Sequence, residues 1–182
     1  MKKLLFFLLL TTAVVGRAQT SLDLLPVGTE APDFTITDSK TGKKIFQLSD
    51  KKTQKDKDGK TVPGVWTVLD FWASWCPWCL KFADFVEKNV AVNKMVNDHF
   101  EYIHVNYNRR KTAGDAAVKK AEQLMKRLNN PQRFGFPVFV VLDETGKVLH
   151  IQDSSFLEEG KGYNEEKVLR FLKSWTPQAV KG

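Results

Sequence analysis

Cys76 and Cys79 are the only cysteines of this 182-residue chain, and two residues separate them. The mostly apolar residues 65–72 just before them predict a buried strand that ends beside the pair. A cysteine followed by Pro77 is typical of a helix start, with Cys76 as N-cap and the proline at the first helical position. Unpaired N–H groups and the helix dipole favour a thiolate there, and the thiolate is the nucleophile of disulfide exchange. Cys79, one turn into the helix, lies within reach of the same sulfur and can resolve the bond that Cys76 makes.

Two other uses of the cysteine pair have weaker support. A structural zinc site needs four ligands, but His99, His104 and His150 show no ligand-like spacing, and no second cysteine pair exists. We interpret each histidine as a surface residue or a satisfied core residue. A purely structural disulfide would close too small a loop to constrain the unfolded chain much.

Residues 1–18 have the pattern of a secretory signal. Lys2 and Lys3 precede the apolar residues 4–10, and the stretch ends in small residues at Ala18, after which we expect cleavage. The apolar run is shorter than the about 20 residues that a membrane span needs, so we expect no stable span after cleavage. Export would make the protein periplasmic or secreted, where disulfide chemistry has substrates.

Composition is that of a globular domain with a substantial core. The chain is 42% hydrophobic and carries a formal net charge of +7, part of which lies in the predicted signal. Lysine and arginine mix with aspartate and glutamate along most helical stretches instead of gathering on one face. This distribution argues against nucleic acid as a partner.

Apolar runs alternate between strand and helix periods, which predicts an α/β fold. We expect residues 19–61 to form an N-terminal extension, residues 62–176 the main domain and residues 177–182 a tail. The expected elements are a hairpin of residues 34–37 and 44–48, a solvated lysine-rich loop at 50–60, the central strand to residue 72, a helix to about residue 88, a strand at 100–107, a helix from Asp115 through Leu128, a strand at 136–143, an antiparallel strand at 147–152 and a last helix at about 164–175.

Residues 68–79, Val-Leu-Asp-Phe-Trp-Ala-Ser-Trp-Cys-Pro-Trp-Cys, and residues 135–143, Gly-Phe-Pro-Val-Phe-Val-Val-Leu-Asp, carry a resemblance to a known family. Over about residues 62–176 the chain resembles the thioredoxin superfamily. The lead-in at residues 28–50 resembles the start of secreted thiol:disulfide interchange proteins, and residues 76–106 resemble the periplasmic disulfide-reductase type. The resemblance implies a thioredoxin fold, with a central mixed β-sheet flanked by helices and an added N-terminal β-hairpin.

The resemblance also assigns roles. The first cysteine of the family, here Cys76, attacks the substrate disulfide, and the second, here Cys79, resolves the mixed disulfide. Asp70 matches a buried acid that moves a proton to or from the second cysteine. Pro137 matches the cis-proline opposite the cysteines, beside which the backbone of Phe136 pairs with the substrate chain. The implied partners are protein disulfides or dithiols and a redox partner that resets the Cys76–Cys79 disulfide; no cofactor is needed, because the dithiol carries the two electrons.

Some of these residues have simpler interpretations. Asp70 could instead be a strand-end carboxylate paired with a lysine, and Pro137 an ordinary trans proline at the start of a strand. Trp75 and Trp78 flank the cysteines, and with Pro77 they are expected to contact an apolar substrate segment.

The chain departs from plain thioredoxin in three places. Pro77-Trp78 stands between the cysteines where thioredoxins usually have Gly-Pro, and a proline in first position resembles glutaredoxins and disulfide-bond oxidases. No proline occurs between Cys79 and Lys94, where thioredoxin has a helix kink. Residues 109–130 are longer than in thioredoxin, which we interpret as a solvated, mixed-charge helix, with partner specificity as the alternative.

The sequence therefore predicts an exported thiol-disulfide oxidoreductase. Reduction of protein substrates is favoured, because Asp70 would help to resolve the mixed disulfide. The alternatives are a disulfide oxidase or isomerase, and a non-catalytic binding module that holds a partner through Trp78 and the lysine-rich loop. A peroxidase of the peroxiredoxin type is disfavoured, since Ala73 stands where that family has threonine three residues before its cysteine.

Overall fold

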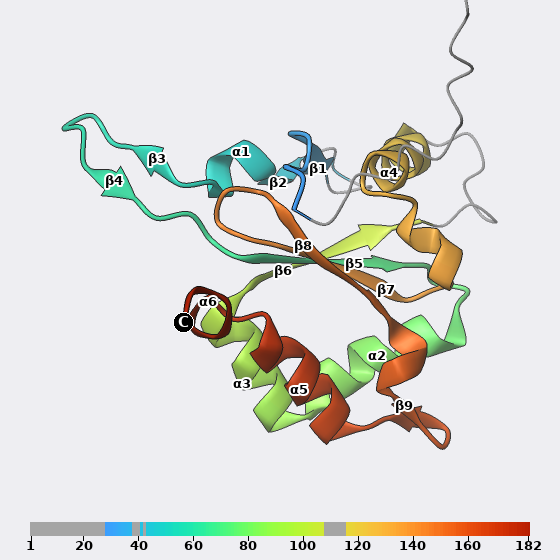
Figure 1. Cartoon of the computed structure of the whole chain (residues 1–182). Helices are drawn as coiled ribbons and strands as arrows, with labels where there is room; N and C mark the ends of the chain where they lie inside the picture. The colour runs from blue at the N-terminus through green and yellow to red at the C-terminus, as the bar shows by residue number, and fades with distance from the viewer. Residues whose placement is uncertain (1–27, 38–40, 42, 108–115) are drawn as a thin grey trace, which may run out of the picture.

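A four-stranded mixed β-sheet forms the centre of the computed structural model, which describes residues 28–37, 41, 43–107 and 116–182 (Figure 1). In spatial order its strands are β6 (Glu101–Asn106), β5 (Thr67–Trp72), β7 (Val138–Leu142) and β8 (Val148–Asp153). β5 runs parallel to β6 and antiparallel to β7, and β8 runs antiparallel to β7. The predicted signal and the expected helix cap Asp115 lie outside the described residues.

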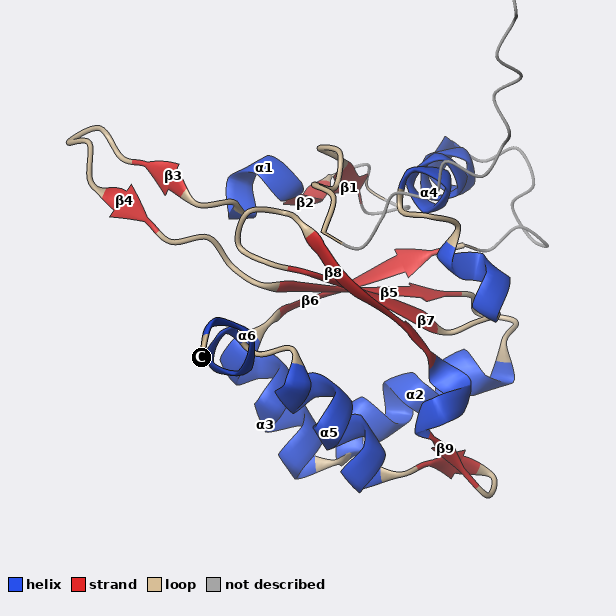
Figure 2. Ribbon diagram, viewed as in Figure 1, coloured by secondary structure: helices blue, strands red, loops and turns tan. Residues whose placement is uncertain are grey.

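Helices cover both faces of this sheet (Figure 2). One face carries the hairpin of β1 (Thr35–Thr37) and β2 (Lys44–Gln47) with α1 (Leu48–Lys51) and α4 (Ala116–Arg127), and the other carries α2 (Pro77–Lys88), α3 (Val90–His99), α5 (Glu165–Ser174) and α6 (Pro177–Lys181). A separate hydrophobic core lies on each face. The α/β architecture with a mixed sheet flanked by helices and an N-terminal hairpin is therefore confirmed.

Strand β5 is buried on both faces, which explains its nearly continuous apolar sequence. Leu69 and Phe71 belong to the core on the α4 side, and Val68 belongs to the core under α2, α3 and α5. Because side chains alternate along a strand, Asp70 shares the face of Val68 and lies on the side of α2. The cysteine pair follows directly after this strand.

Helices α2 and α3 are separated at a single residue, Asn89, without any proline. Its backbone leaves the helical conformation (φ −82°, ψ 108°), and its side-chain oxygen accepts the N–H of Val92 at 2.9 Å, which caps α3. The amide nitrogen of the same side chain donates to Glu165 at the start of α5, at 2.6 Å. An asparagine cap thus makes the helix break that a proline makes in thioredoxin.

Several other expected elements are confirmed. Strand β8 returns antiparallel to β7 after a turn in which Asp143 Oδ1 accepts the N–H of Thr145 and Gly146 has a positive φ of 82°. Helix α5 starts after Asn164, whose side chain accepts the N–H of Lys167. β1 and β2 pair as the predicted hairpin.

Three segments contain structure that the sequence did not predict. Leu48 does not end the second hairpin strand but begins α1, because Asp33 accepts the N–H of Ser49 and turns the chain. The lysine-rich segment is exposed but contains a short hairpin of β3 (Gln54–Lys55) and β4 (Thr61–Val62), whose turn is held by Asp56; it projects away from the sheet in Figure 1. The C-terminal tail contains the short helix α6, which Thr176 caps, and Lys181 pairs with Glu144.

The interpretation of residues 109–130 as a solvated helix is also wrong for the part that the structure describes. α4 packs one face into the core beside the β1–β2 hairpin, and its charged residues face outward. The buried side chains recur at helical spacing: Val118, Ala121, Leu124, Met125 and, just past the helix end, Leu128. A 3₁₀ turn, η1 (Pro131–Phe134), which the sequence did not indicate, then leads to β7.

None of the helices within the described ranges is both long and apolar enough to cross a membrane.

Replacing Asn89 by alanine should lower the free energy of unfolding by about 1 kcal/mol, because the first turn of α3 loses its cap. Asn97, an exposed asparagine of the same helix whose side chain bonds only to Asn93, provides the matched control. Asn97→Ala should change stability by less than about 0.5 kcal/mol. Urea unfolding of both variants tests this, and equal stabilities for the two would show that the Asn89 cap contributes nothing.

Candidate active site

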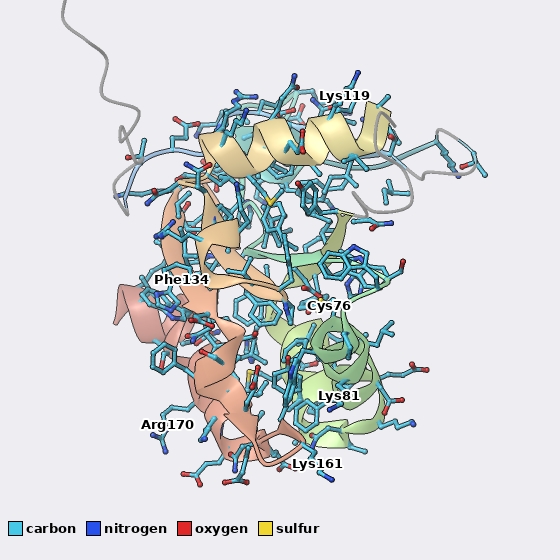
Figure 3. The ribbon with its side chains drawn as sticks, turned by 90° about the vertical axis from the view of Figure 1, so that its right-hand side faces the viewer. Cys76, Lys81, Lys119, Phe134, Lys161 and Arg170 are labelled. Atoms are coloured by element: carbon cyan, nitrogen blue, oxygen red, sulfur yellow. The ribbon has the colours of Figure 1, made fainter. Side chains whose placement is uncertain are left out.

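Cys76 is the N-cap of α2, as the sequence predicts, and Pro77 occupies the first turn. The Cys79 N–H donates to Cys76 Sγ at 3.3 Å, so the sulfur satisfies one of the free N–H groups at the helix start. Both cysteines are free thiols, and 5% of Cys76 and 2% of Cys79 is exposed. Of the two, Cys76 is the one at the positive end of the helix dipole (Figure 3).

The segment before β7 lies against this sulfur. Cys76 Sγ donates to the carbonyl oxygen of Phe136 at 3.3 Å, and the Phe136–Pro137 peptide bond is cis, which excludes the trans alternative. The pairing of Phe71 with Val138 in the sheet fixes this proximity, because it brings the start of β7 beside the end of β5. The structure thus brings together the cysteines, Phe136 and Pro137.

Asp70 is 2% exposed, and its charge acts on Cys79. Its Oδ2 accepts the hydroxyl of Tyr102 at 2.9 Å and lies 3.0 Å from Nδ1 of His104. The alternative of a lysine partner is therefore wrong: both partners come from the adjacent strand β6 and neither is a lysine. Oδ1 of Asp70 is buried and has no hydrogen-bond partner among the described residues.

Burial dominates the electrostatics of the site. Burial raises the pKa of the Cys79 thiol well above its ordinary value of 9.0, and the hydrogen bond with Cys76 and the charge of Asp70 raise it further. Burial and the nearby Asp70 likewise raise the pKa of Tyr102, and burial raises that of Tyr163. Cys79 is consequently held as a thiol at neutral pH and needs a proton acceptor before it can attack.

Aromatic side chains surround the cysteines. Trp75, Trp78 and Phe136 are half-buried and pack against the cysteine cluster, whereas Pro77 is exposed. The carbonyl of Trp78 accepts the hydroxyl of Tyr163 at 3.2 Å, and the Lys81 ammonium lies 4.3 Å from the centre of the Trp78 ring.

The chain between β8 and α5 supports this aromatic group. It contains a 3₁₀ turn, η2 (Ser154–Leu157), and a hairpin of β9 (Glu158–Glu159) and β10 (Gly162–Tyr163). Lys81 of α2 donates to the carbonyl of Lys161 in the hairpin turn at 2.8 Å. Figure 3 shows Lys81 and Lys161 at the same end of the molecule. The hairpin therefore fixes the first turns of α2 from outside the sheet.

Sequence reasoning missed Tyr102, His104 and Tyr163 as neighbours of the site. The register Asp70–His104 across parallel strands places the histidine beside the acid. Tyr102 and His104 alternate with apolar residues in a strand next to β5. This pattern does not identify their partners, because the partners depend on the register of the two strands.

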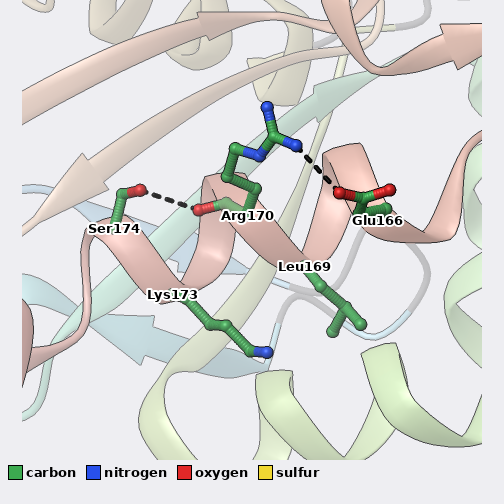
Figure 4. A pocket seen from close by; sticks show the side chains of 5 residues that line it. All are labelled: Glu166, Leu169, Arg170, Lys173 and Ser174. Carbon is green, nitrogen blue, oxygen red and sulfur yellow. Dashed lines mark hydrogen bonds and ion pairs between the residues drawn. The ribbon is translucent and has the colours of Figure 1, made fainter.

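A shallow pocket on α5 is lined by Glu166, Leu169, Arg170, Lys173 and Ser174, and holds an exposed Arg170–Glu166 ion pair (Figure 4). It contains none of the predicted site residues. Within the described part of the chain, no three His, Cys, Asp or Glu side chains are arranged to hold a metal ion.

Comparison with known proteins decides the family. Residues 54–153 match the family model described as a thioredoxin-like domain, which is more than half of the chain. The chain belongs to the thioredoxin-like family. With its Cys76–Cys79 pair it is a thiol-disulfide oxidoreductase of that family.

Relatives are distant. The thiol-disulfide oxidoreductase ResA of Bacillus thuringiensis is 27% identical over 168 residues, which cover 87% of this chain and 83% of the relative. ResA of Bacillus cereus is 27% identical over 163 residues, covering 84% and 80%. The solution structure of a putative protein disulfide isomerase from Bacteroides thetaiotaomicron is 25% identical, covers 81% of this chain and 86% of its own, and has a TM-score of 0.50.

The raised pKa values predict alkaline destabilisation of the reduced protein. On unfolding, Cys79 would release its proton near 9.0 and Tyr102 and Tyr163 near 10.0, whereas the folded protein holds these protons to higher pH. Because the folded state then binds more protons, the free energy of unfolding is unaffected below about pH 8 and falls as pH rises above about 9.

Urea unfolding between about pH 7 and 11 measures this effect. The oxidised protein, in which Cys79 has no proton, should begin to lose stability at a pH about one unit higher. In the Tyr102→Phe variant, the free energy of unfolding should fall less steeply above about pH 10. Stability that stays constant to pH 11 would contradict the raised pKa values.

Proposed function

We propose that this protein is exported and uses Cys76 and Cys79 to reduce disulfides of protein substrates. Cys76 attacks a substrate disulfide as a thiolate, forming a mixed disulfide and releasing one substrate thiolate. Cys79 then attacks Cys76 Sγ, the mixed disulfide breaks, and the second substrate thiolate leaves. The protein ends with a Cys76–Cys79 disulfide and needs a redox partner to reset it; the dithiol carries both electrons, so the cycle uses no cofactor.

One observation carries the assignment of the nucleophile. Cys76 Sγ, and not Cys79 Sγ, stands at the helix start, where it accepts a backbone N–H and lies against the Phe136 carbonyl. A thiolate there is stabilised by the N–H groups and by the helix dipole. Cys79 is deeper, and its raised pKa suits a thiol that attacks only after the mixed disulfide has formed.

Asp70 is the proposed proton acceptor for Cys79. It is the buried carboxyl whose charge acts on Cys79, and its Oδ1 has no hydrogen-bond partner within the described ranges. The second step requires removal of the Cys79 proton, because a thiol is a poor nucleophile. A proton acceptor for Cys79 favours completion of substrate reduction. This is our reason for preferring a reductant to an oxidase or isomerase.

The substrate would bind across the exposed side of the cysteine pair. We propose that its backbone pairs with Phe136 beside Pro137, while Trp75, Pro77 and Trp78 contact apolar groups next to the substrate disulfide. Support comes from the 3.3 Å contact between Phe136 and Cys76 and from the clustering of these aromatic side chains around the sulfur.

Export rests on the sequence of residues 1–18, and the domain division is proposed with it. The mature protein would begin at Gln19, with an extension over residues 19–61, the thioredoxin-like domain over residues 62–176 and a short C-terminal segment over residues 177–182. It would act in the periplasm or outside the cell.

Cysteine variants test the mechanism. Cys76→Ser should lower disulfide reduction to the rate without protein, because the attacking sulfur is lost. Cys79→Ala should carry out the first step only and accumulate a one-to-one mixed disulfide with a substrate such as insulin, visible by non-reducing electrophoresis and mass spectrometry. Protein alkylated at both cysteines is the control for both variants. Normal turnover by Cys76→Ser would exclude the mechanism, and undiminished substrate binding by alkylated protein with no turnover would favour a binding module.

Fractionation tests export. Expressed in a Gram-negative host, the full chain should appear in the periplasmic or secreted fraction with an N-terminus at Gln19 by mass spectrometry. A chain lacking residues 1–18 should stay in the cytosol. Full-length protein in the cytosol with an intact N-terminus would contradict export.

A further inference from the structure

A histidine connects the buried acid with solvent. His104 lies on β6 directly across from Asp70 on β5, and its Nδ1 is 3.0 Å from Asp70 Oδ2. The exposure of the two side chains differs sharply: 46% of the histidine side chain is exposed, against 3% of the aspartate. Solvent protons therefore reach His104 far more readily than they reach Asp70.

The two carboxylate oxygens of Asp70 differ in their hydrogen-bond partners. Oδ2 accepts the hydroxyl of Tyr102 and faces His104, whereas Oδ1 has no partner in the described part of the chain. An ionised carboxylate can only accept, so with Asp70 ionised the hydrogen between the two groups lies on Nδ1 of His104. Oδ1 is left to receive a proton from elsewhere.

We infer that His104 is a positioning residue whose charge sets how readily Asp70 accepts the Cys79 proton during resolution of the mixed disulfide. The inference rests on the proposed function. In this step the Cys79 S–H bond breaks and its proton goes to Asp70 Oδ1. The sulfur electron pair forms the Cys79–Cys76 bond, and the bond from Cys76 to the substrate breaks with its electron pair on the leaving thiolate.

The sign of the effect follows from the contact. Histidine changes charge between about pH 5 and 8. An imidazolium next to Asp70 stabilises the carboxylate and makes it a weaker proton acceptor, whereas neutral imidazole does not. A positive charge would also help Cys79 to ionise directly, but the described residues show no hydrogen bond between His104 and Cys79, and the 3.0 Å contact to Asp70 makes the effect on the acid the larger one. Resolution should therefore be slower when His104 is charged.

Other titratable groups near Asp70 do not change charge in this range. Those facing it are Tyr102 from β6 and Cys79 from α2; Tyr163 from β10 acts on Tyr102 and is itself affected by Cys79. Burial raises the pKa of all three. Cys76 has no proton to lose, since it is in the mixed disulfide during this step. The rings of Trp72 and Tyr102 that pack on His104 carry no charge.

Stopped-flow reaction of the reduced protein with 5,5′-dithiobis(2-nitrobenzoate) separates the two steps. The first thionitrobenzoate released reports attack by Cys76, and the second reports resolution by Cys79. In the wild-type protein we expect the rate of the second phase to fall about tenfold from about pH 8 to pH 5.5.

His104→Gln, which keeps a donor for Asp70 but does not titrate, should vary less than about twofold over the same pH range. His104→Lys, which stays charged, should remain near the slow wild-type rate of pH 5.5 throughout. His99→Gln, a histidine substitution at the end of α3, should keep the wild-type profile. Thermal unfolding of each variant shows that the fold is retained.

The results of these measurements distinguish failure of the inference from failure of the proposed function. A flat profile for His104→Gln together with a slow second phase for His104→Lys supports the inference. A tenfold pH dependence that persists in His104→Gln, or a fast second phase in His104→Lys, overturns it while leaving the proposed function intact. A wild-type protein without any second phase would instead remove the resolving role of Cys79, and with it the proposed function.

Discussion

The register of β5 between β6 and β7 is the constraint on which the site depends. Pairing of Phe71 with Val138 brings the start of β7 beside the end of β5, so that Phe136 and Pro137 lie against Cys76. Pairing of Asp70 with His104 on the other side sets the partners of the buried acid. A slip of one residue would turn Asp70 to the opposite face of the sheet, away from α2. The two hydrophobic cores, which bury both faces of β5, prevent that slip.

Position and burial give the two cysteines different surroundings, although only two residues separate them. Cys76 caps α2 and receives the Cys79 N–H, whereas Cys79 lies in the first turn of the helix, is more buried, and is acted on by the charge of Asp70. The same burial that raises the pKa of Cys79 leaves Asp70 with one oxygen held by β6 and the other without a partner among the described residues. The Cys79 thiol and the Asp70 oxygen that we propose as its proton acceptor thus lie on the same side of the sheet.

Much of this arrangement could be predicted from the sequence, because local signals determine it. The apolar run to Trp72, the cysteine followed by Pro77 and the turn at Asp143 each act over a few residues and were interpreted correctly. The α6 helix and the β3–β4 hairpin were missed because they are short and largely exposed, so apolar periodicity gave no signal. The buried face of α4 was underestimated, since charged residues lie between its apolar ones and half of the apolar ones are alanines. His104 was missed for a different reason: its contact with Asp70 depends on strand register, which no local pattern encodes.

The reduction potential of the Cys76–Cys79 couple tests the central claim, a dithiol that reduces protein substrates. Equilibration with glutathione or dithiothreitol, read by the fluorescence of Trp75 and Trp78 beside the sulfurs, gives this value. The account predicts a reversible two-electron transition near about −270 mV, the value of a thioredoxin-like reductant. A potential between about −120 and −200 mV would contradict it and indicate an oxidase or isomerase.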